Sequence, residues 1–266
     1  MTAPALAARG LSKSFGGLKA VDALTIDVPH GALYGLIGPN GAGKTTVFNL
    51  LTGVYTPDAG TVSVGGALMT GKKPSDIARA GMVRTFQNIR LFGDLTVLDN
   101  VRIAAGVRAR AGMFRSLLRT PLYLREEAEI RARSRHLLDV LGIGHRADEV
   151  AKSLPYGDQR RLEIARALAT QPKVLLLDEP VAGMNTGEKQ AMRGLIQLLR
   201  EQFDVSILLI EHDMGLVMDI CEHITVIDHG VTIAQGEPAA IQSDPAVIEA
   251  YLGVPDDLAA ADQEGG

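Results

Sequence analysis

The stretch from Gly38 to Thr46 satisfies the pattern G-x-x-x-x-G-K-[ST] of a phosphate-binding loop. Glycines in such a loop let backbone N–H groups approach phosphate oxygens, and the N-terminus of the following helix adds a positive field. We expect Lys44 to reach the β- and γ-phosphates of a nucleotide and the Thr45 hydroxyl to ligate Mg²⁺. The predicted nucleotide-binding residues are Gly38, Pro39, Asn40, Gly41, Ala42, Gly43, Lys44, Thr45 and Thr46. A glycine-rich turn without a ligand is the alternative.

Two adjacent carboxylates, Asp178 and Glu179, follow the apolar run 174–177. The run predicts a buried parallel strand, and ligand sites of open α/β sheets lie at the carboxyl ends of such strands. We expect Asp178 to hold Mg²⁺ through water and Glu179 to accept a proton from an attacking water. A solvated acidic turn is the alternative, and it fits poorly after so apolar a strand. His212 ends the next predicted strand, where a histidine either contacts the γ-phosphate or is structural.

The flanking elements agree with this site. Residues 32–37 predict a strand before the glycine loop, and Val47, Leu50 and Leu51 fall on one face of a helix after it. Further strands are predicted at 5–15, 19–28, within 55–71 and at 82–86, which makes the first third of the chain strand-rich. Phe15, at the end of the first strand, is explained equally well by stacking on an adenine ring and by packing in the core.

The middle of the chain changes to helical periodicity. Apolar residues recur at helical spacing from about 95 to 150, and Gly142 ends a helix predicted over 126–141. The remaining elements are predicted as helices over 159–170, 187–201 and 245–252, a strand over 205–210 and a hairpin of 223–228 with 231–234. The tail beyond 255 contains four acids and is expected to be frayed.

Composition narrows the class of protein. The 266 residues are 46% hydrophobic, enough for a large core, and the net charge of −4 with a pI near 5.9 gives no indication of nucleic-acid binding. Cys221 is the single cysteine and is expected to be a small buried thiol, which fits a reducing compartment. No apolar run approaches the roughly 20 residues of a membrane helix, and no signal pattern precedes residue 9. We therefore expect a soluble protein of the cytoplasm.

One segment departs from the acidic average. Between Arg102 and Arg146 there are ten arginines against four acids, Glu126, Glu127, Glu129 and Asp139, a local excess of +6. A solvated helical face explains this excess most simply. A surface near anionic lipid or an acidic partner is the second explanation.

The order of the motifs resembles that of the ABC-type ATPases. The glycine loop, Gln87, the run Leu154-Pro155-Tyr156-Gly157-Asp158-Gln159-Arg160-Arg161, the pair Asp178-Glu179 and His212 follow one another as in that family. The resemblance extends to about residue 252. The runs 154–166, 182–185, 211–214 and 249–253 resemble the LivG-type ATP-binding subunits of bacterial branched-chain amino acid uptake transporters. The segment around 104–125 also resembles this subunit.

The resemblance implies roles for matching residues. Phe15 would stack on adenine, Gln87 would sense Mg²⁺ and connect to a helical subdomain, and residues 41–46 would hold phosphates. The signature segment Leu154, Pro155, Tyr156, Gly157 and Asp158 would face the ATP of an opposite subunit. The chain departs from the common signature Leu-Ser-Gly-Gly-Gln, because Pro155 replaces the serine and Tyr156 the first glycine. Asn185 stands where the family usually has aspartate.

The implied fold is an α/β P-loop NTPase (RecA-like) core with a strand-rich N-terminal subdomain and an inserted α-helical subdomain. The domain would span 1–254, with the insertion at about 89–160, and the acidic tail at 255–266 is expected to be disordered. The implied function is ATP hydrolysis, with ATP and Mg²⁺ as cofactors, that drives import of branched-chain or related amino acids. Alternatives are another cargo, such as urea or an exported lipid, and a soluble ABC ATPase of DNA repair or translation.

The resemblance also implies partners and a location. The subunit would form a head-to-tail dimer with itself or with a paralogous ATP-binding subunit. It would contact membrane permease subunits through the groove beside Gln87, where Arg90, Leu91 and Phe92 lie. A periplasmic solute-binding protein would act on it only indirectly, and nucleic acid would not be a partner. The expected place is the cytoplasmic side of the inner membrane, as a peripheral subunit.

Overall fold

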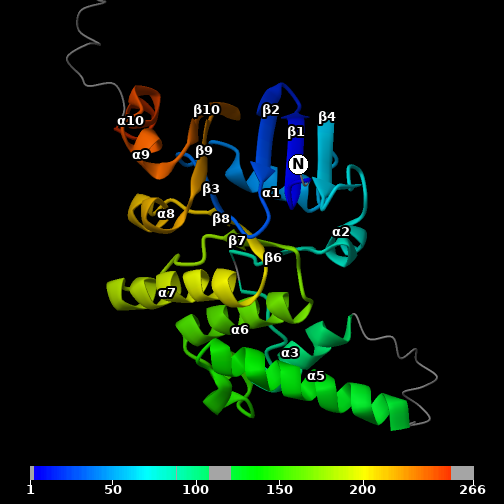
Figure 1. Cartoon of the computed structure of the whole chain (residues 1–266). Helices are drawn as coiled ribbons and strands as arrows, with labels where there is room; N and C mark the ends of the chain where they lie inside the picture. The colour runs from blue at the N-terminus through cyan, green and yellow to red at the C-terminus, as the bar shows by residue number, and fades with distance from the viewer. Residues whose placement is uncertain (1–2, 88, 108–120, 253–266) are drawn as a thin grey trace, which may run out of the picture.

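The computed structural model describes residues 3–87, 89–107 and 121–252, and it contains two β-sheets and several helices (Figure 1). The larger sheet has the strand order β10-β9-β3-β8-β7-β6, and all of its strands are parallel except β10. Its strands are β3 (Leu33–Ile37), β6 (Met82–Arg84), β7 (Val174–Asp178), β8 (Ser206–Ile210), β9 (His223–Asp228) and β10 (Val231–Gly236).

The central strands of this sheet are buried on both faces. In β8, Ile207 and Leu209 point into a core shared with the helices, whereas Leu208 and Ile210 point into a core shared with the N-terminal sheet. Two-sided burial explains why these strands are continuous apolar runs instead of alternating patterns. It also leaves their carboxyl ends as the places where polar side chains can emerge.

The N-terminal third forms the second sheet, with the order β2-β1-β4-β5 and antiparallel pairing. Its strands are β1 (Leu6–Phe15), β2 (Leu18–Val28), β4 (Ala59–Val64) and β5 (Ala67–Leu68). Helix α1 (Lys44–Leu51) packs with this sheet and with one face of the large sheet, through Val47, Phe48 and Leu51. The helix after the glycine loop is therefore fixed from two sides.

The helices between β6 and β7 form a separate layer at the bottom of Figure 1. They are α3 (Val97–Gly106), α5 (Pro121–Val140) and α6 (Tyr156–Ala169), with short 3₁₀ turns at Gly144–Arg146 and Ala151–Ser153. The predicted apolar stripe of α5 is buried, with Leu137 and Leu138 in the same core as Leu162 of α6. Helix α7 (Thr186–Gln202) lies between this layer and the large sheet in the view of Figure 1.

The predicted α/β class and the strand-rich start are confirmed, with differences at particular elements. The helix predicted over 159–170 begins three residues earlier, because Pro155 occupies its N-cap position. It ends at Ala169, one residue before the predicted end. Three short helices were not predicted: α2 (Pro74–Ala80), α8 (Met214–Ile220) and α9 (Pro238–Gln242). Each has seven residues or fewer, too few turns to show a periodic apolar stripe. The last helix, α10 (Pro245–Leu252), has the predicted bounds.

Two predicted features lie wholly or partly outside the described residues, namely the 255–266 tail and residues 108–120 of the basic segment between Arg102 and Arg146. Several of the described arginines of that segment are paired. Arg102 forms ion pairs with Asp99 and Glu127, and Arg146 forms them with Glu149 and Asp158. Paired arginines agree with the solvated-face explanation for this part of the segment. Within the described ranges, no helix combines the length and apolarity needed to cross a bilayer.

Candidate functional site

The glycine loop between β3 and α1 is shaped by close backbone contacts. A Cβ on Gly38 would lie 2.1 Å from the carbonyl oxygen of Ile227, and one on Gly43 would lie 2.5 Å from that of Ala20. Gly43 also has a φ of +104°, which side-chain-bearing residues rarely adopt. The glycines are therefore required by the strands packed around the loop, β2 and β9, as well as by the approach to phosphate.

Lys44 starts α1 and is nearly buried, with 7% of its surface exposed. Its ammonium donates to the carbonyl oxygens of Gly38 at 2.6 Å and Pro39 at 2.9 Å, so it lies inside its own loop. Burial lowers the pKa of Lys44, and the carboxylates of Glu179 and Asp178 oppose that shift. The loop lysine and the two strand-end carboxylates therefore lie close enough to interact electrostatically.

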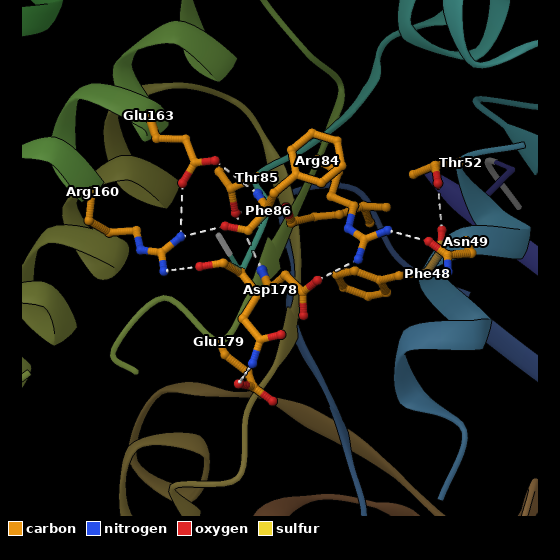
Figure 2. Close-up of polar contacts among 12 residues, drawn as sticks. Phe48, Asn49, Thr52, Arg84, Thr85, Phe86, Arg160, Glu163, Asp178 and Glu179 are labelled. Atoms are coloured by element: carbon orange, nitrogen blue, oxygen red, sulfur yellow. Dashed lines mark hydrogen bonds and ion pairs between the residues drawn. The ribbon is translucent and has the colours of Figure 1, made fainter. Parts of the chain in front are cut away.

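Asp178 ends β7 and is held by an arginine that the sequence analysis did not single out. Arg84 Nη2 lies 2.5 Å from Asp178 Oδ2, and Arg84 Nη1 donates to Asn49 Oδ1 at 2.8 Å (Figure 2). The guanidinium lies 5.3 Å from the ring centroids of both Phe48 and Phe86. The sequence signal for Arg84 was a charged residue at the end of the short strand 82–84. That signal does not identify the partner, because Asp178 lies 94 positions away in sequence.

Glu179 follows directly, and its backbone is strained. Its φ is +45°, an unfavourable value for a residue with a side chain, and its N–H donates to Ile210 O at 2.9 Å on the neighbouring strand. Gln87 Nε2 donates to Glu179 Oε2 at 2.8 Å. The structure thus brings together two residues that the sequence predicted from motifs 92 positions apart.

His212 follows β8, next to β7 in the sheet, and its side chain is 57% exposed. The Oε2 atom of Glu211 lies 3.8 Å from His212 Nδ1. Glu211 is fully buried and accepts the N–H groups of Val181 at 3.1 Å and His212 at 3.2 Å. Burial raises the pKa of Glu211, and these N–H groups oppose the shift. Glu211 thus braces both the loop after Glu179 and the loop that bears His212.

Phe15 is not a core residue. Its ring is 42% exposed and packs edge-to-face on Tyr55, with 5.2 Å between centroids and 70° between planes. Of the two explanations that the sequence left open, core packing is wrong. An exposed ring supported by a second aromatic is a surface on which a flat ligand can stack.

The signature segment lies at the start of α6. Pro155 is the N-cap of this helix without a side-chain hydrogen bond, Tyr156 is 45% exposed, and Asp158 pairs with Arg146 Nε at 3.0 Å. Among the described residues, no hydrogen bond or ion pair joins residues 154–158 to the glycine loop. The structure therefore does not bring the signature to the phosphate loop of its own chain.

Asn185, where aspartate is usual, has a structural explanation. It is the N-cap of α7, and its Oδ1 accepts from Glu188 N at 3.0 Å while Glu188 Oε2 accepts from Asn185 N at 2.9 Å. Asparagine and aspartate serve equally well as caps. The substitution therefore leaves the loop after Glu179 anchored.

The donor set of this site fits Mg²⁺ that arrives with a nucleotide. No cluster of three or more histidine, cysteine or acidic side chains suited to a metal occurs among the residues described. Mg²⁺ in phosphate sites uses one or two carboxylates, hydroxyls, water and the phosphates themselves. Thr45 and Asp178 have the hydroxyl and the carboxylate that such an ion would need, and Arg84 bonds Asp178 through Oδ2.

The segments that form this site match a known protein family. A family model described as "ABC transporter" matches residues 21–182, the part that contains the glycine loop, the signature segment and the strand-end carboxylates. The chain belongs to this family. A second model, described as "Branched-chain amino acid ATP-binding cassette transporter", matches residues 231–257. As an ABC cassette the chain is an ATP-binding, ATP-hydrolysing protein with a P-loop NTPase fold.

The relatives cover the chain almost completely. The high-affinity branched-chain amino acid transport ATP-binding protein LivG of Salmonella typhimurium is 46% identical over 253 residues, covering 95% of this chain and 99% of the relative. BraF of Pseudomonas aeruginosa, with the same description, is 45% identical over the same length. A crystal structure of the ADP conformation of an ABC transporter ATP-binding cassette matches with a TM-score of 0.81 and 32% identity, over 96% of this chain and 100% of that chain.

Proposed function

We propose that this chain is the ATP-hydrolysing subunit that energises import of branched-chain or related amino acids by an ABC transporter. The observation that supports it most is the 46% identity, over nearly all of both chains, to a subunit described as serving branched-chain amino acid transport. The match of residues 231–257 to the branched-chain amino acid model supports the same cargo.

The site residues divide into those that hold the nucleotide and those that act on it. Phe15 would stack on adenine, and residues 38–46 would hold the phosphates with Lys44 as their cation. Thr45 and Asp178 would hold Mg²⁺, assisted by Gln87; when bound, this ion neutralises charge on the phosphates. Glu179 would accept the proton of the attacking water. His212, exposed at the end of the adjacent strand, would face the γ-phosphate.

Completion of the site requires a second subunit. Because no described hydrogen bond or ion pair joins the signature segment to its own glycine loop, we propose a head-to-tail dimer, with itself or a paralogous subunit, in which residues 154–158 face the partner's ATP. Pro155 has neither a hydroxyl nor an N–H, so the N–H groups of the first turn of α6 and its helix dipole would supply that contact.

The permease would dock beside Gln87. A groove of ≈ 420 Å³ lies there, lined by Phe86, Arg90, Phe92, Ile103 and Arg166 among others. Arg90 lies over the ring of Phe86 at 4.3 Å and Arg166 over that of Phe92 at 4.8 Å, so the groove is aromatic and basic. Docking there would place the subunit at the cytoplasmic side of the inner membrane, as a peripheral protein.

Two variants test the chemistry. Lys44→Ala should abolish hydrolysis and weaken ATP binding, because it removes the cation that faces the phosphates. Glu179→Gln should bind ATP and accumulate as a closed dimer on size exclusion, because it keeps the shape but removes the base. Hydrolysis by Glu179→Gln at the wild-type rate would contradict the role given to Glu179.

The cargo requires the assembled transporter. Copurification with detergent-extracted permease subunits would exclude a soluble ABC ATPase of DNA repair or translation. In reconstituted vesicles with the binding protein, leucine, isoleucine or valine should stimulate ATPase activity. Stimulation by urea or by lipid instead would reassign the cargo and leave the ATPase assignment intact.

A further inference from the structure

A buried ion pair on α6 holds the backbone of Phe86 and Gln87. Arg160 is fully buried, and its Nη1 donates to Phe86 O at 2.6 Å and to Glu163 Oε2 at 2.9 Å, while its Nη2 donates to Gln87 O at 2.8 Å. Glu163 Oε1 accepts the N–H of Phe86 at 3.0 Å. Figure 2 shows the two side chains reaching from α6 to this segment. Three backbone groups just past the end of β6 are thereby satisfied by two side chains.

Stability alone does not account for this pair. Two charges removed from water are seldom more favourable than a well-packed apolar pair of the same size, and burial raises the pKa of Glu163. The fork of the guanidinium, however, matches two carbonyl oxygens and a carboxylate at once, which no apolar side chain does. The pair is therefore suited to fixing the position of the segment relative to α6.

The same guanidinium contacts the signature. Arg160 Nη2 also donates to the Tyr156 hydroxyl at 3.2 Å, and Tyr156 is the first residue of α6. On the other side, Gln87 Nε2 donates to Glu179 at 2.8 Å. Side-chain hydrogen bonds thus link Glu179 to Gln87, Gln87 to Arg160 and Arg160 to Tyr156.

We propose that Arg160 and Glu163 are a positioning pair that locks the Gln87 segment to α6, so that a change at the Gln87–Glu179 contact reorients the signature. This inference rests on the proposed head-to-tail dimer, in which the signature serves the partner's ATP. Glu179, the proposed base of one ATP site, is then linked through these side chains to the signature segment that completes the other ATP site.

Two conservative variants separate this role from general packing. Arg160→Lys keeps the charge and the stem, but its single ammonium cannot hold both carbonyls and Glu163 in the fork geometry. Arg161→Lys is the matched control, because Arg161 lies on the same helix and donates to Leu141 O at 3.1 Å, away from the Gln87 segment. Both substitutions leave the net charge unchanged.

The first measurement is hydrogen–deuterium exchange of the nucleotide-free protein, followed on peptides within 82–87 and 154–161. Arg160→Lys should speed exchange at Phe86, whose N–H is bonded to Glu163, at least tenfold, and Arg161→Lys should leave it within twofold. Exchange at Phe86 within twofold of wild type in both variants would overturn the lock. This arm needs neither nucleotide nor dimer, so it is independent of the proposed function.

The second measurement is ATP-driven dimerisation by sedimentation in a Glu179→Gln background. Arg160→Lys should weaken dimerisation at least tenfold while ATP binding to the monomer stays within twofold, and Arg161→Lys should match the background. Equal dimerisation by both variants would overturn the coupling. If Arg160→Lys fails to fold, Arg160→Met with Glu163→Met removes both charges, and the same two readouts decide. Failure of the control itself to bind ATP or dimerise would instead contradict the proposed function.

Discussion

Replacement of Arg84 by methionine tests the ion pair at the end of β7. The side chains of Arg84 and Asp178 are 8% and 6% exposed, so the variant would leave a carboxylate buried without its cation. Removing one partner of such a pair costs about 3–5 kcal/mol. Methionine keeps the apolar stem between Phe48 and Phe86, so most of the packing stays.

The expected change in melting temperature follows from the size of the chain. Domains of roughly 150–250 residues lose about 2–4 °C per kcal/mol, so Arg84→Met should lower the melting temperature of the nucleotide-free protein by about 6–20 °C. Asp178→Asn removes the charge that Arg84 compensates. The double variant should therefore be more stable than the sum of the two single effects predicts, by roughly 1–3 kcal/mol.

Scanning calorimetry, with urea unfolding as a second probe, measures the stability of the wild type, the two single variants and the double variant, which together form a double-mutant cycle. Arg102→Met is the control, since its partners Asp99 and Glu127 are 40% and 34% exposed and compensation by water should limit its cost to about 1 kcal/mol. A loss below about 1 kcal/mol for Arg84→Met, or additive effects in the cycle, would refute the buried-pair reasoning.

Three further predictions concern single sites. Pro155→Ser in a Glu179→Gln background should tighten ATP-driven dimerisation about tenfold or more by sedimentation, because a hydrogen bond to a charged group is worth ~1.5–3 kcal/mol; equal or weaker dimerisation would mean that Pro155 does not face the nucleotide. Burial raises the pKa of Glu211, so the native state binds its proton more tightly than the unfolded state and stability falls as pH rises from about 4.5. As pH rises above about 4.5, the melting temperature of Glu211→Gln should therefore increase relative to that of the wild type. If the melting temperatures of the two proteins change in parallel with pH, Glu211 does not have this effect. Burial raises the pKa of Cys221 from 9.0 to about 12, so at pH 8 its thiolate should be roughly a thousandfold scarcer than in the unfolded chain, and a thiol reagent should label it only on unfolding; prompt labelling of the native protein would contradict its burial.

The parts of the site that could be predicted from sequence are those whose signal is local. The glycine loop, Asp178 and Glu179 each sit at the end of a short apolar run, and strand ends are where parallel sheets present polar groups. Helix α6 was predicted, but its start was placed too late, since a proline N-cap gives no polar capping signal.

Arg84 and Arg160 could not be predicted as site residues. Their partners lie 94 and 73 positions away, and an arginine next to apolar residues looks the same in sequence whether it is buried or extends to solvent. The choice for Phe15 likewise depended on Tyr55, which lies 40 positions further along the chain, between α1 and β4. Only the pairing of distant strands decides such contacts.

The strand order has a consequence for synthesis of the chain. β3, which leads into the glycine loop, pairs on one side with β8 and on the other with β9, and Gly38 packs against the backbone of Ile227. Gly230 N also donates to Ala42 O at 2.9 Å. A nascent chain therefore cannot close its nucleotide pocket until about residue 230 has left the ribosome, although the loop itself emerges nearly 190 residues earlier. During that interval the apolar edges of β3 are open, and a chaperone has the opportunity to bind them before ATP does.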